Sequence, residues 1–365
     1  MPSTVRTFVP PHCPRSSCPS HHCAAGWRWK RHGTYTRDCV PRVVDRYRCC
    51  HCGATFSSQT FATSYYLKRP ELMVPLFYRV LACSGYRQMA REMRCAHSTL
   101  VWQAARIAQH CVKFLAQHGP TGEAAEPLVI DGFESFAGSP YQPLHVNLVV
   151  GALSHYIRAF THSHLRRKGS MRPEQKLRRE ALEATFGRPD PKAVELGMLA
   201  ALQIAMPKPQ AVVIRSDEHP AYVRTLRRLK DHQIRHEQTN SKEARTKDNP
   251  LFPVNAADQD LRHNGANHKR ETIAFSKSHQ GVVERAILTV TWRNFSKPLS
   301  ANHDPRTAAM VLGLSETPMT PEAILAKRIF RWKVALPEPW AGYYDRKVDT
   351  PGITNPRRLT LKRAG

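Results

Sequence analysis

Three acidic residues occur where a carboxylate is hard to explain as ordinary surface charge. Asp131 lies inside the strand-like run EPLVIDGFESFAG, residues 126–138, and Asp217 ends the compact apolar run AVVIRSD. Glu284, in GVVERAIL, has helical spacing with apolar neighbours such as Ile287. Aspartate is depleted in strands, and carboxylates are seldom buried unless they are paired or bind something. The three acids are therefore candidates for one site.

The chemistry that such a site favours is metal-assisted phosphoryl transfer. Two acids on strands and one on a helix can converge at one edge of a mixed sheet, where their oxygens suit Mg²⁺ or Mn²⁺. Two such ions, about 3.5–4 Å apart, clamp the attacking and leaving oxygens of an in-line displacement. For each acid the ordinary alternative is a surface aspartate at a strand end or a glutamate in a helix salt bridge. The third position is the least constrained, because Asp258, Asp260 and Glu271 lie in the same interval.

The cysteines suggest a second metal site at the front of the chain. Seven of the ten cysteines lie in the first 52 residues, in a region with little helical periodicity. Cys49 and Cys52 form a C-x2-C-G knuckle, and Cys13 and Cys18 form an upstream pair. Two such pairs about 30 residues apart are typical of a zinc ribbon with four thiolates around Zn²⁺. Cys23 could replace Cys18, and a set of unmetallated thiols is the alternative.

A helix-turn-helix is predicted between residues 84 and 115. Two short helical patterns are separated by a break at CAH, and Ser98 is a good N-cap for the second. In a helix-turn-helix that second helix enters the major groove, which would bring Ser98, Thr99, Gln103 and Arg106 near base edges or phosphates. A plain αα-hairpin would give the same pattern.

The charge balance points to a polyanionic partner. The chain carries 55 Lys and Arg against 29 Asp and Glu, a formal charge of +26, and the excess recurs along the whole sequence. Double-stranded DNA is the partner we expect, with Arg166, Arg167 and Lys168 among the phosphate contacts. No apolar run approaches the length of a membrane helix and the start has no signal-peptide core, so we expect a soluble intracellular protein that does not contact membranes.

Alternating strand-like and helix-like segments from residue 128 onward predict an α/β (α+β) fold with a mixed sheet and flanking helices. A Gly/Pro-containing stretch before them marks a domain boundary. The predicted divisions are a zinc ribbon at 1–60, a helix-turn-helix region at 61–118, a linker at 119–127, a catalytic domain at 128–315 with an insertion or extended loop at about 238–270, and a basic C-terminal extension at 316–365.

Five segments in this order resemble the small bacterial insertion-sequence transposases of the DDE type. They are YRCCHCGATFSSQTF, SGYRQMAREMRC with STLVWQAARI, VIDGFESF, VIRSDEHPAY and RETIAFSKSHQGVVERAILTVTWRNFSKP, and the resemblance runs over about residues 10–315. It implies a ribonuclease H-like catalytic domain behind a zinc ribbon and a helix-turn-helix. It also implies that Asp131, Asp217 and Glu284 are the three catalytic acids, with catalytic Mg²⁺ or Mn²⁺ and structural Zn²⁺.

The activity implied by this resemblance is binding of the ends of an insertion element, followed by DNA cleavage and strand transfer through two-metal phosphoryl transfer. Such enzymes work as homo-oligomers, in a bacterial cytoplasm and in association with the nucleoid. The interval between Asp217 and Glu284 is longer than in compact members, which leaves the third acid the least secure. The rivals are a non-catalytic DNA-binding regulator derived from a transposase and a nuclease on the same fold that cuts without strand transfer.

Overall fold

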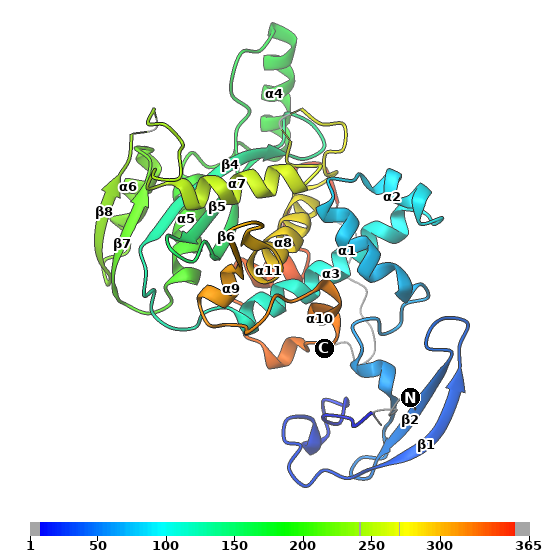
Figure 1. Cartoon of the computed structure of the whole chain (residues 1–365). Coiled ribbons are helices and arrows are strands. Elements are labelled where there is room, and N and C mark those ends of the chain that lie inside the picture. Colours follow the sequence, from blue (N-terminus) through cyan, green and yellow to red (C-terminus); the bar gives the residue numbers. More distant parts are fainter. Residues whose placement is uncertain (1–7, 241, 270, 355–365) are drawn as a thin grey trace.

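A five-stranded mixed sheet forms the centre of the main body in a computed structural model that describes residues 8–240, 242–269 and 271–354 (Figure 1). Its strands are β4 (Leu128–Phe136), β5 (Pro143–Gly151), β6 (Ile157–His164), β7 (Ala211–Ser216) and β8 (Gln233–Gln238). They lie in the order β6-β5-β4-β7-β8. The first three strands pair antiparallel, whereas β7 is parallel to β4 and β8 is parallel to β7. The predicted α/β architecture, a mixed sheet with flanking helices, is confirmed.

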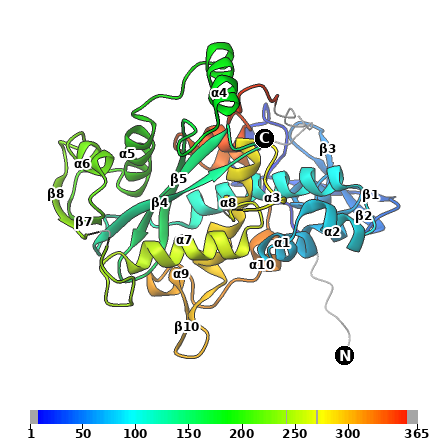
Figure 2. The same ribbon diagram turned by 90° about the horizontal axis from the view of Figure 1, so that it is seen from above.

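Helices cover both faces of the sheet, so its central strands are buried on both sides (Figure 2). The helices are α5 (Ala193–Ala205), α6 (Pro220–Leu226), α7 (Phe252–Asn264) and α8 (His279–Phe295). Leu128 and Ile130 of β4 join the apolar cluster on the side of α5, whereas Val129 and Phe133 join the cluster on the side of α7 and α8. Because side chains alternate along a strand, Asp131 belongs to the α7 side.

Three helices precede the sheet and share its core. They are α1 (Met73–Leu81), α2 (Tyr86–Glu92) and α3 (His97–His118). One apolar cluster runs from these helices through α8 to β4, β5 and β6, because α3 packs along α8. The predicted linker 119–127 connects α3 to β4 beside this shared core.

The N-terminal module is a three-stranded antiparallel sheet that lies below the main body in Figure 1. Its strands are β1 (Trp29–Thr36), β2 (Val43–Cys49) and β3 (Thr55–Ser57). One face covers a cluster that includes Tyr47, Phe56 and Phe330, and the last of these comes from the C-terminal part of the chain. Phe330 therefore ties the C-terminal part of the described chain to the N-terminal module.

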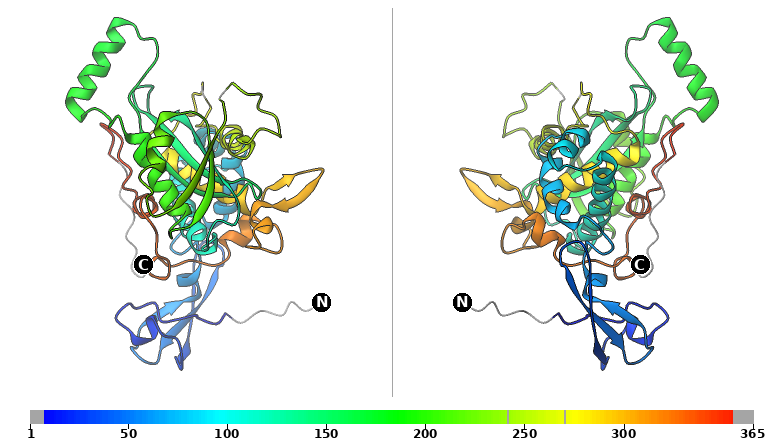
Figure 3. Two further views of the ribbon diagram at one scale, coloured as in Figure 1. Left: turned by 90° about the vertical axis from the view of Figure 1, so that its left-hand side faces the viewer. Right: turned by 90° about the vertical axis from the view of Figure 1, so that its right-hand side faces the viewer.

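The remaining elements are shorter or stand away from the body. Helix α4 (Pro173–Phe186) has no buried residue and projects outward (Figures 1 and 3). A small hairpin and three short helices follow α8: β9 (Pro298–Ser300), β10 (Asp304–Thr307), α9 (Ala308–Val311), α10 (Pro321–Leu325) and α11 (Trp340–Tyr344). Single 3-10 turns occur at Pro19–His21, Ser58–Phe61, Pro70–Leu72 and Arg331–Lys333.

Helix α7 occupies part of the segment that we expected to be an insertion or extended loop, 238–270. Its apolar residues Val254, Ala257 and Leu261 are buried and recur at helical spacing. This spacing was readable in the sequence, but polar residues on the other face obscured it. Most of the final basic stretch, residues 355–365, lies outside the described residues.

Gly197 lets α5 lie close to the sheet. A β-carbon built there would meet the Ser163 hydroxyl and would lie 2.6 Å from Asn147 Nδ2. Glycine to alanine in a helix interior normally stabilises by about 1 kcal/mol, but here overpacking costs about 1–3 kcal/mol. We expect Gly197→Ala to lower the melting temperature by several degrees in a thermal scan. Gly122→Ala, where the added carbon meets nothing within 4 Å, is the matched control. A rise for Gly197→Ala would contradict this packing.

Candidate active site and metal centre

The parallel pairing of β4 with β7 brings two of the predicted acids together. Leu128 pairs with Ile214 and Val129 with Arg215, and the same offset continued sets Asp131 level with Asp217. Asp217 follows the last residue of β7, and its Oδ1 accepts a hydrogen bond from the backbone N–H of His219 (2.9 Å). Both carboxylates are half-buried. The structure therefore sets the two strand-borne acids side by side at one edge of the sheet.

Tyr222 of α6 holds Asp131 in place. Its ring is buried in the cluster below α6, and its hydroxyl donates to Asp131 Oδ1 at 3.0 Å. Burial, followed by the negative charges of Asp131 and Asp217, raises the pKa of the Tyr222 phenol well above its usual value. The hydroxyl is therefore a permanent donor at neutral pH. Tyr222 was not among the predicted site residues, although it lies in the motif VIRSDEHPAY.

Asp258 of α7 is the third acid at this edge. One carboxylate oxygen, Oδ1, is buried without a hydrogen-bond partner. Burial and then the negative charge of Asp131 raise the pKa of Asp258 well above its usual value. Burial, with a contribution from Asp217, also raises the pKa of Asp131 to about 6. Acids that repel each other's ionised form, one of them with an oxygen that lacks a donor, form an environment that a cation would relieve.

Glu284 lies elsewhere, in contact with the C-terminal part of the chain. It is buried on α8, its Oε1 lies 2.9 Å from Arg346 Nε, and it accepts from Gln280 Nε2 at 3.0 Å. Burial raises the pKa of Glu284 to about 6, and the groups that oppose this shift are Arg346 and Gln280. Glu284 is thus an ion-pair partner, and the structure does not bring it to Asp131 and Asp217.

The other open candidates for the third acid are engaged or exposed. Asp260 forms ion pairs with Arg293 (3.0 Å) and Lys297 (3.5 Å). Glu271 is exposed to solvent. Asp258 alone combines burial, an oxygen without a donor and electrostatic coupling to Asp131.

The donor set of this edge fits a hard divalent cation. Three carboxylates and one fixed phenol donor supply only oxygen atoms, which Mg²⁺ and Mn²⁺ prefer. The carboxylate oxygens of Asp131, Asp217 and Asp258 do not all lie within 4.8 Å of one another, unlike the cysteine sulfurs at the front of the chain. Magnesium keeps several waters when bound to proteins, so it does not require three carboxylates in direct contact.

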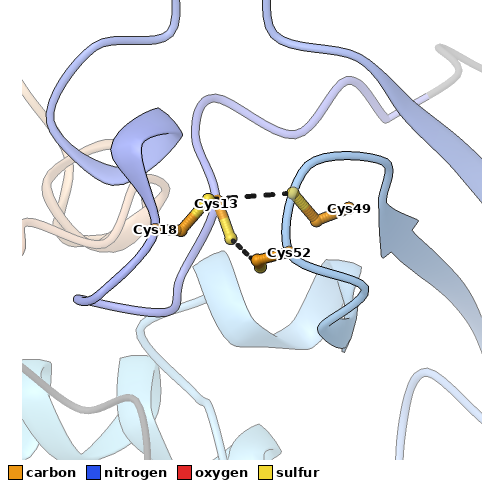
Figure 4. A group of neighbouring side chains, drawn as sticks. All are labelled: Cys13, Cys18, Cys49 and Cys52. Carbon is orange, nitrogen blue, oxygen red and sulfur yellow. Dashed lines mark hydrogen bonds between the residues drawn. The ribbon is translucent and has the colours of Figure 1, made fainter.

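Four cysteines form the second centre, in the N-terminal module (Figure 4). The sulfurs of Cys13, Cys18, Cys49 and Cys52 all lie within 4.8 Å of one another. Cys13 Sγ is 3.7 Å from Cys52 Sγ, and Cys18 Sγ is 3.9 Å from Cys49 Sγ. A tetrahedral zinc site with bonds of about 2.3 Å would separate its sulfurs by about 3.8 Å, whereas a disulfide needs about 2 Å. The predicted four-cysteine cluster is confirmed, and its geometry fits structural zinc.

The surroundings act differently on the individual sulfurs. Burial raises the pKa of the Cys13 and Cys18 thiols. Burial acts in the same direction on Cys49, but N–H donors, first the backbone of Cys52 and then the indole of Trp27 (3.2 Å), lower its pKa to about 6. Cys23 is exposed and takes no part in the cluster, so the choice between Cys18 and Cys23 falls on Cys18.

Two of the four residues that we predicted to contact DNA from the second helix are instead hydrogen-bonded within the protein. Gln103 is 3% exposed and donates to the backbone oxygen of Arg69 (2.8 Å). Arg106 donates to the backbone oxygens of Thr63 and Tyr65 (2.9 and 2.5 Å). The prediction that these two side chains reach base edges or phosphates is wrong, because the loop before α1 covers this side of α3.

The start of α3 remains accessible. The helix begins at His97 with Ala96 as its N-cap, so Ser98 lies inside the first turn and is not the cap that we predicted. Ser98 is exposed and Thr99 is half-buried. These two residues stay candidates for DNA contact.

The basic segment after β6 is partly neutralised. Arg166 forms a two-pronged ion pair with Glu183 of α4 (2.7 and 2.9 Å), and the Arg167 guanidinium lies 4.3 Å from the centre of the Tyr141 ring. Lys168 is exposed. Burial lowers the pKa of His145 to about 4, and the charges of both Lys168 and Asp217 also act on it.

Replacing Tyr222 by phenylalanine should weaken the site without removing a ligand. The variant loses the donor that orients Asp131, and loss of such a supporting hydrogen bond costs about 10–100-fold in metal affinity or activity. We expect a metal-dependent activity that saturates only at a higher Mg²⁺ concentration. Tyr78→Phe is the control, because it removes a hydroxyl bonded to Glu322 (3.1 Å) at the surface. An unchanged Mg²⁺ titration for Tyr222→Phe would refute the positioning role.

Comparison with known proteins gives distant structural likenesses only. No protein family and no curated protein matches the chain. An intasome structure of simian T-cell lymphotropic virus, in complex with the PP2A regulatory subunit B56 gamma, is 14% identical. The match covers 60% of this chain and 76% of that one, with a TM-score of 0.26. The integrase catalytic core domain of HTLV-2, in complex with magnesium, is 12% identical over 51% of this chain and 97% of that one, with a TM-score of 0.22. At such values neither structure assigns a role to any residue here.

None of the helices in the described ranges is long and apolar enough to cross a membrane.

Proposed function

We propose that the chain is a DNA transposase of the DDE type, in which the third acid is Asp258. The observation that carries the proposal is the convergence of Asp131, Asp217 and Asp258 at one sheet edge, with an unpartnered oxygen on Asp258. A DNA-binding regulator needs no such group of mutually repelling carboxylates. The formal charge of +26 and the zinc-ribbon geometry support a DNA substrate.

The residues of this edge would act by position and charge. Asp131 and Asp217 project from neighbouring parallel strands, and Asp258 approaches from the helix that covers that face. Mg²⁺ or Mn²⁺ held there would stabilise the charge that develops on phosphate oxygens and lower the pKa of an attacking water or 3′-hydroxyl. Tyr222 keeps Asp131 oriented.

In the proposed reaction, water first cleaves the phosphodiester at the element end and leaves a 3′-hydroxyl. That hydroxyl then attacks a phosphodiester of target DNA, and the departing 3′-oxygen of the target takes a proton. No bond to the protein forms in either step, so the acids need only hold metal and orient the nucleophile. The proposed assembly is a homo-oligomer on two DNA ends, in a bacterial cytoplasm.

The test is cleavage and strand transfer on DNA that carries the element ends, in Mg²⁺ or Mn²⁺. Products of both steps are expected for the intact chain and neither product for Asp131→Asn or Asp217→Asn, although both variants should still bind the DNA. Cleavage without joined products would identify a nuclease. Binding of the ends without cleavage in either metal would favour the regulator.

Metal binding at this edge should depend on pH. The folded protein raises the pKa of Asp131 from 3.8 to about 6, so the metal-free fold binds the proton more tightly than the unfolded chain does. This group therefore makes the metal-free protein less stable as pH rises between about 4 and 6, and protons compete with metal over the same range. We expect the increase in melting temperature on adding Mg²⁺ to be small at pH 5 and to grow through pH 6. Asp131→Asn should lack the increase at every pH, and a pH-independent increase in the intact chain would contradict the site.

A further inference from the structure

The outer face of the N-terminal sheet carries positive charge that nothing in the described structure neutralises. In antiparallel strands, residues directly opposite each other share a face. Trp29, Tyr47 and Phe56 lie on the face toward the aromatic cluster. Lys30 lies opposite Arg48, and by alternation Arg46 shares their face, which is the outer one. We call Lys30, Arg46 and Arg48 the ribbon face.

The ribbon face is unfavourable for a protein without a partner. Lys30 and Arg48 place like charges directly across a strand pair, which destabilises a sheet. Among the described residues, no ion pair includes Lys30, Arg46 or Arg48. Lys30 and Arg48 are exposed, and Arg46 is half-buried. Three cations on one small sheet, without acids between them, match a row of phosphates.

Beyond the ribbon face, the sheet narrows to two strands. β3 pairs only with Arg46, Tyr47 and Arg48, whereas residues 34–36 of β1 pair with residues 43–45 of β2 alone. We call these six residues and the turn between them the ribbon tip. Every residue of β1 after Trp29 is exposed, and Val43 is 60% exposed. The turn of the tip lies against the segment that leads into α1, because Arg37 donates to Gln59 Oε1 (3.0 Å) and Cys39 Sγ to the backbone oxygen of Leu67 (3.6 Å). The accessible part of the tip is therefore its strand residues.

A bulge separates the tip from the ribbon face. The pairing shifts between Arg31 and Thr34, and Gly33 in this interval has φ of +75°. A glycine with positive φ in a bulge bends the strand and increases its twist. The tip is therefore set at an angle to the cationic face and does not simply extend it.

We propose that the ribbon face binds phosphates of duplex DNA and that the exposed strand residues of the ribbon tip, Thr34, Tyr35 and Thr36, contact the adjacent major groove. A two-stranded antiparallel ribbon fits the major groove, which is about 12 Å wide. Thr34, Tyr35 and Thr36 offer hydroxyl groups and apolar surface for base edges. The inference rests on the proposed DNA function and assigns a surface to it. It also fits the burial of Gln103 and Arg106, which removes half of the residues expected to contact DNA from α3.

The test compares two triple variants in DNA-binding titrations over a range of salt concentrations. The first carries Lys30→Gln, Arg46→Gln and Arg48→Gln. The control carries Lys208→Gln, Arg227→Gln and Lys230→Gln, which removes three exposed charges near β7 and β8. Loss of three phosphate contacts should reduce the slope of log affinity against log salt by about 2–3. The control should keep the slope of the intact chain, and zinc content should be the same in all three proteins.

The tip is tested separately by methylation of guanine N7, which marks the major groove. Methylation should interfere with binding of the intact chain and should not interfere with a variant that carries Thr34→Ala, Tyr35→Ala and Thr36→Ala. Equal salt slopes for the ribbon-face variant and the intact chain, or interference that persists in the tip variant, would overturn the proposal. If the intact chain binds no DNA at any salt concentration, the proposed function itself fails, and that result is distinct from either.

Discussion

Asp258→Asn is expected to abolish DNA cleavage and strand transfer, whereas Glu284→Gln should leave both within a few-fold of the intact chain. Loss of a carboxylate that holds a catalytic metal removes several kcal/mol of transition-state stabilisation, and about 1.4 kcal/mol corresponds to a tenfold change in rate. The expected loss for Asp258→Asn is therefore at least about 10³-fold, measured as the initial rate of cleavage in Mg²⁺.

The effects of the two variants on stability should be the reverse of their effects on cleavage. Glu284→Gln should destabilise the fold, whereas Asp258→Asn should not. Asp258 carries a carboxylate that burial and Asp131 both disfavour when ionised, so asparagine should leave the melting temperature unchanged or raise it. Glu284→Gln removes the counter-charge of Arg346 in a buried pair, which costs up to about 3–5 kcal/mol. A further Arg346→Met change on that background should recover part of the loss.

Opposite effects of the two variants on cleavage and on stability distinguish an acid that holds a metal from an acid in a structural ion pair. A cleavage assay at a temperature where both variants are folded, with DNA binding measured in parallel, gives the decisive comparison. If Glu284→Gln stops cleavage while it remains folded and bound to DNA, and Asp258→Asn still cuts, the third acid is Glu284 and not Asp258.

Cys18→Ser is expected to remove zinc and unfold the N-terminal module, whereas Cys23→Ser should have no effect on either. Cys18 lies in the four-sulfur cluster, but Cys23 is exposed outside it. Structural zinc contributes about 10–16 kcal/mol in small zinc-dependent modules, far more than a sheet of three short strands gains from its own core. The measurements are zinc content per chain and the near-ultraviolet circular dichroism of the aromatic cluster around Tyr47.

The main body should survive this change. Its apolar core includes the helices before the sheet and the strands β4–β6 but none of the four cysteines. We therefore expect Cys18→Ser to show an early loss of the aromatic signal and a retained main transition. Equal zinc content in Cys18→Ser and Cys23→Ser would show that the cluster is not the zinc site.

Local sequence patterns were sufficient to predict the classes of secondary-structure element and the zinc-binding cysteines as a group. The C-x2-C-G knuckle specifies a turn around a metal by spacing alone, and Asp131 and Asp217 stand out because each belongs to a compact apolar strand. Both kinds of signal depend on neighbours in the chain. The structure confirmed the mixed sheet and the four-cysteine cluster, and it chose Cys18 over Cys23 because only Cys18 folds back onto the knuckle.

Which side chains face one another was decided by the tertiary structure. Glu284 and Asp258 are both acids on helices, and fifteen of the seventeen residues of α8 are buried, so no polar face tells which way Glu284 points. Its partner, Arg346, lies 62 positions further along the chain. Gln103 and Arg106 have the residue types of a recognition helix, but contacts with Arg69, Thr63 and Tyr65 turn them inward.

The sequence by itself therefore determined the classes of element, the two kinds of ligand and the excess of positive charge, because each is a property of composition or short spacing. The proposal that Asp258 rather than Glu284 accompanies Asp131 and Asp217 rests on the tertiary structure alone, and so does the set of cations that remain on the surface. The physical reason is that a buried charge is governed by whatever packs against it, and for Glu284 and Asp258 those groups come from distant parts of the chain.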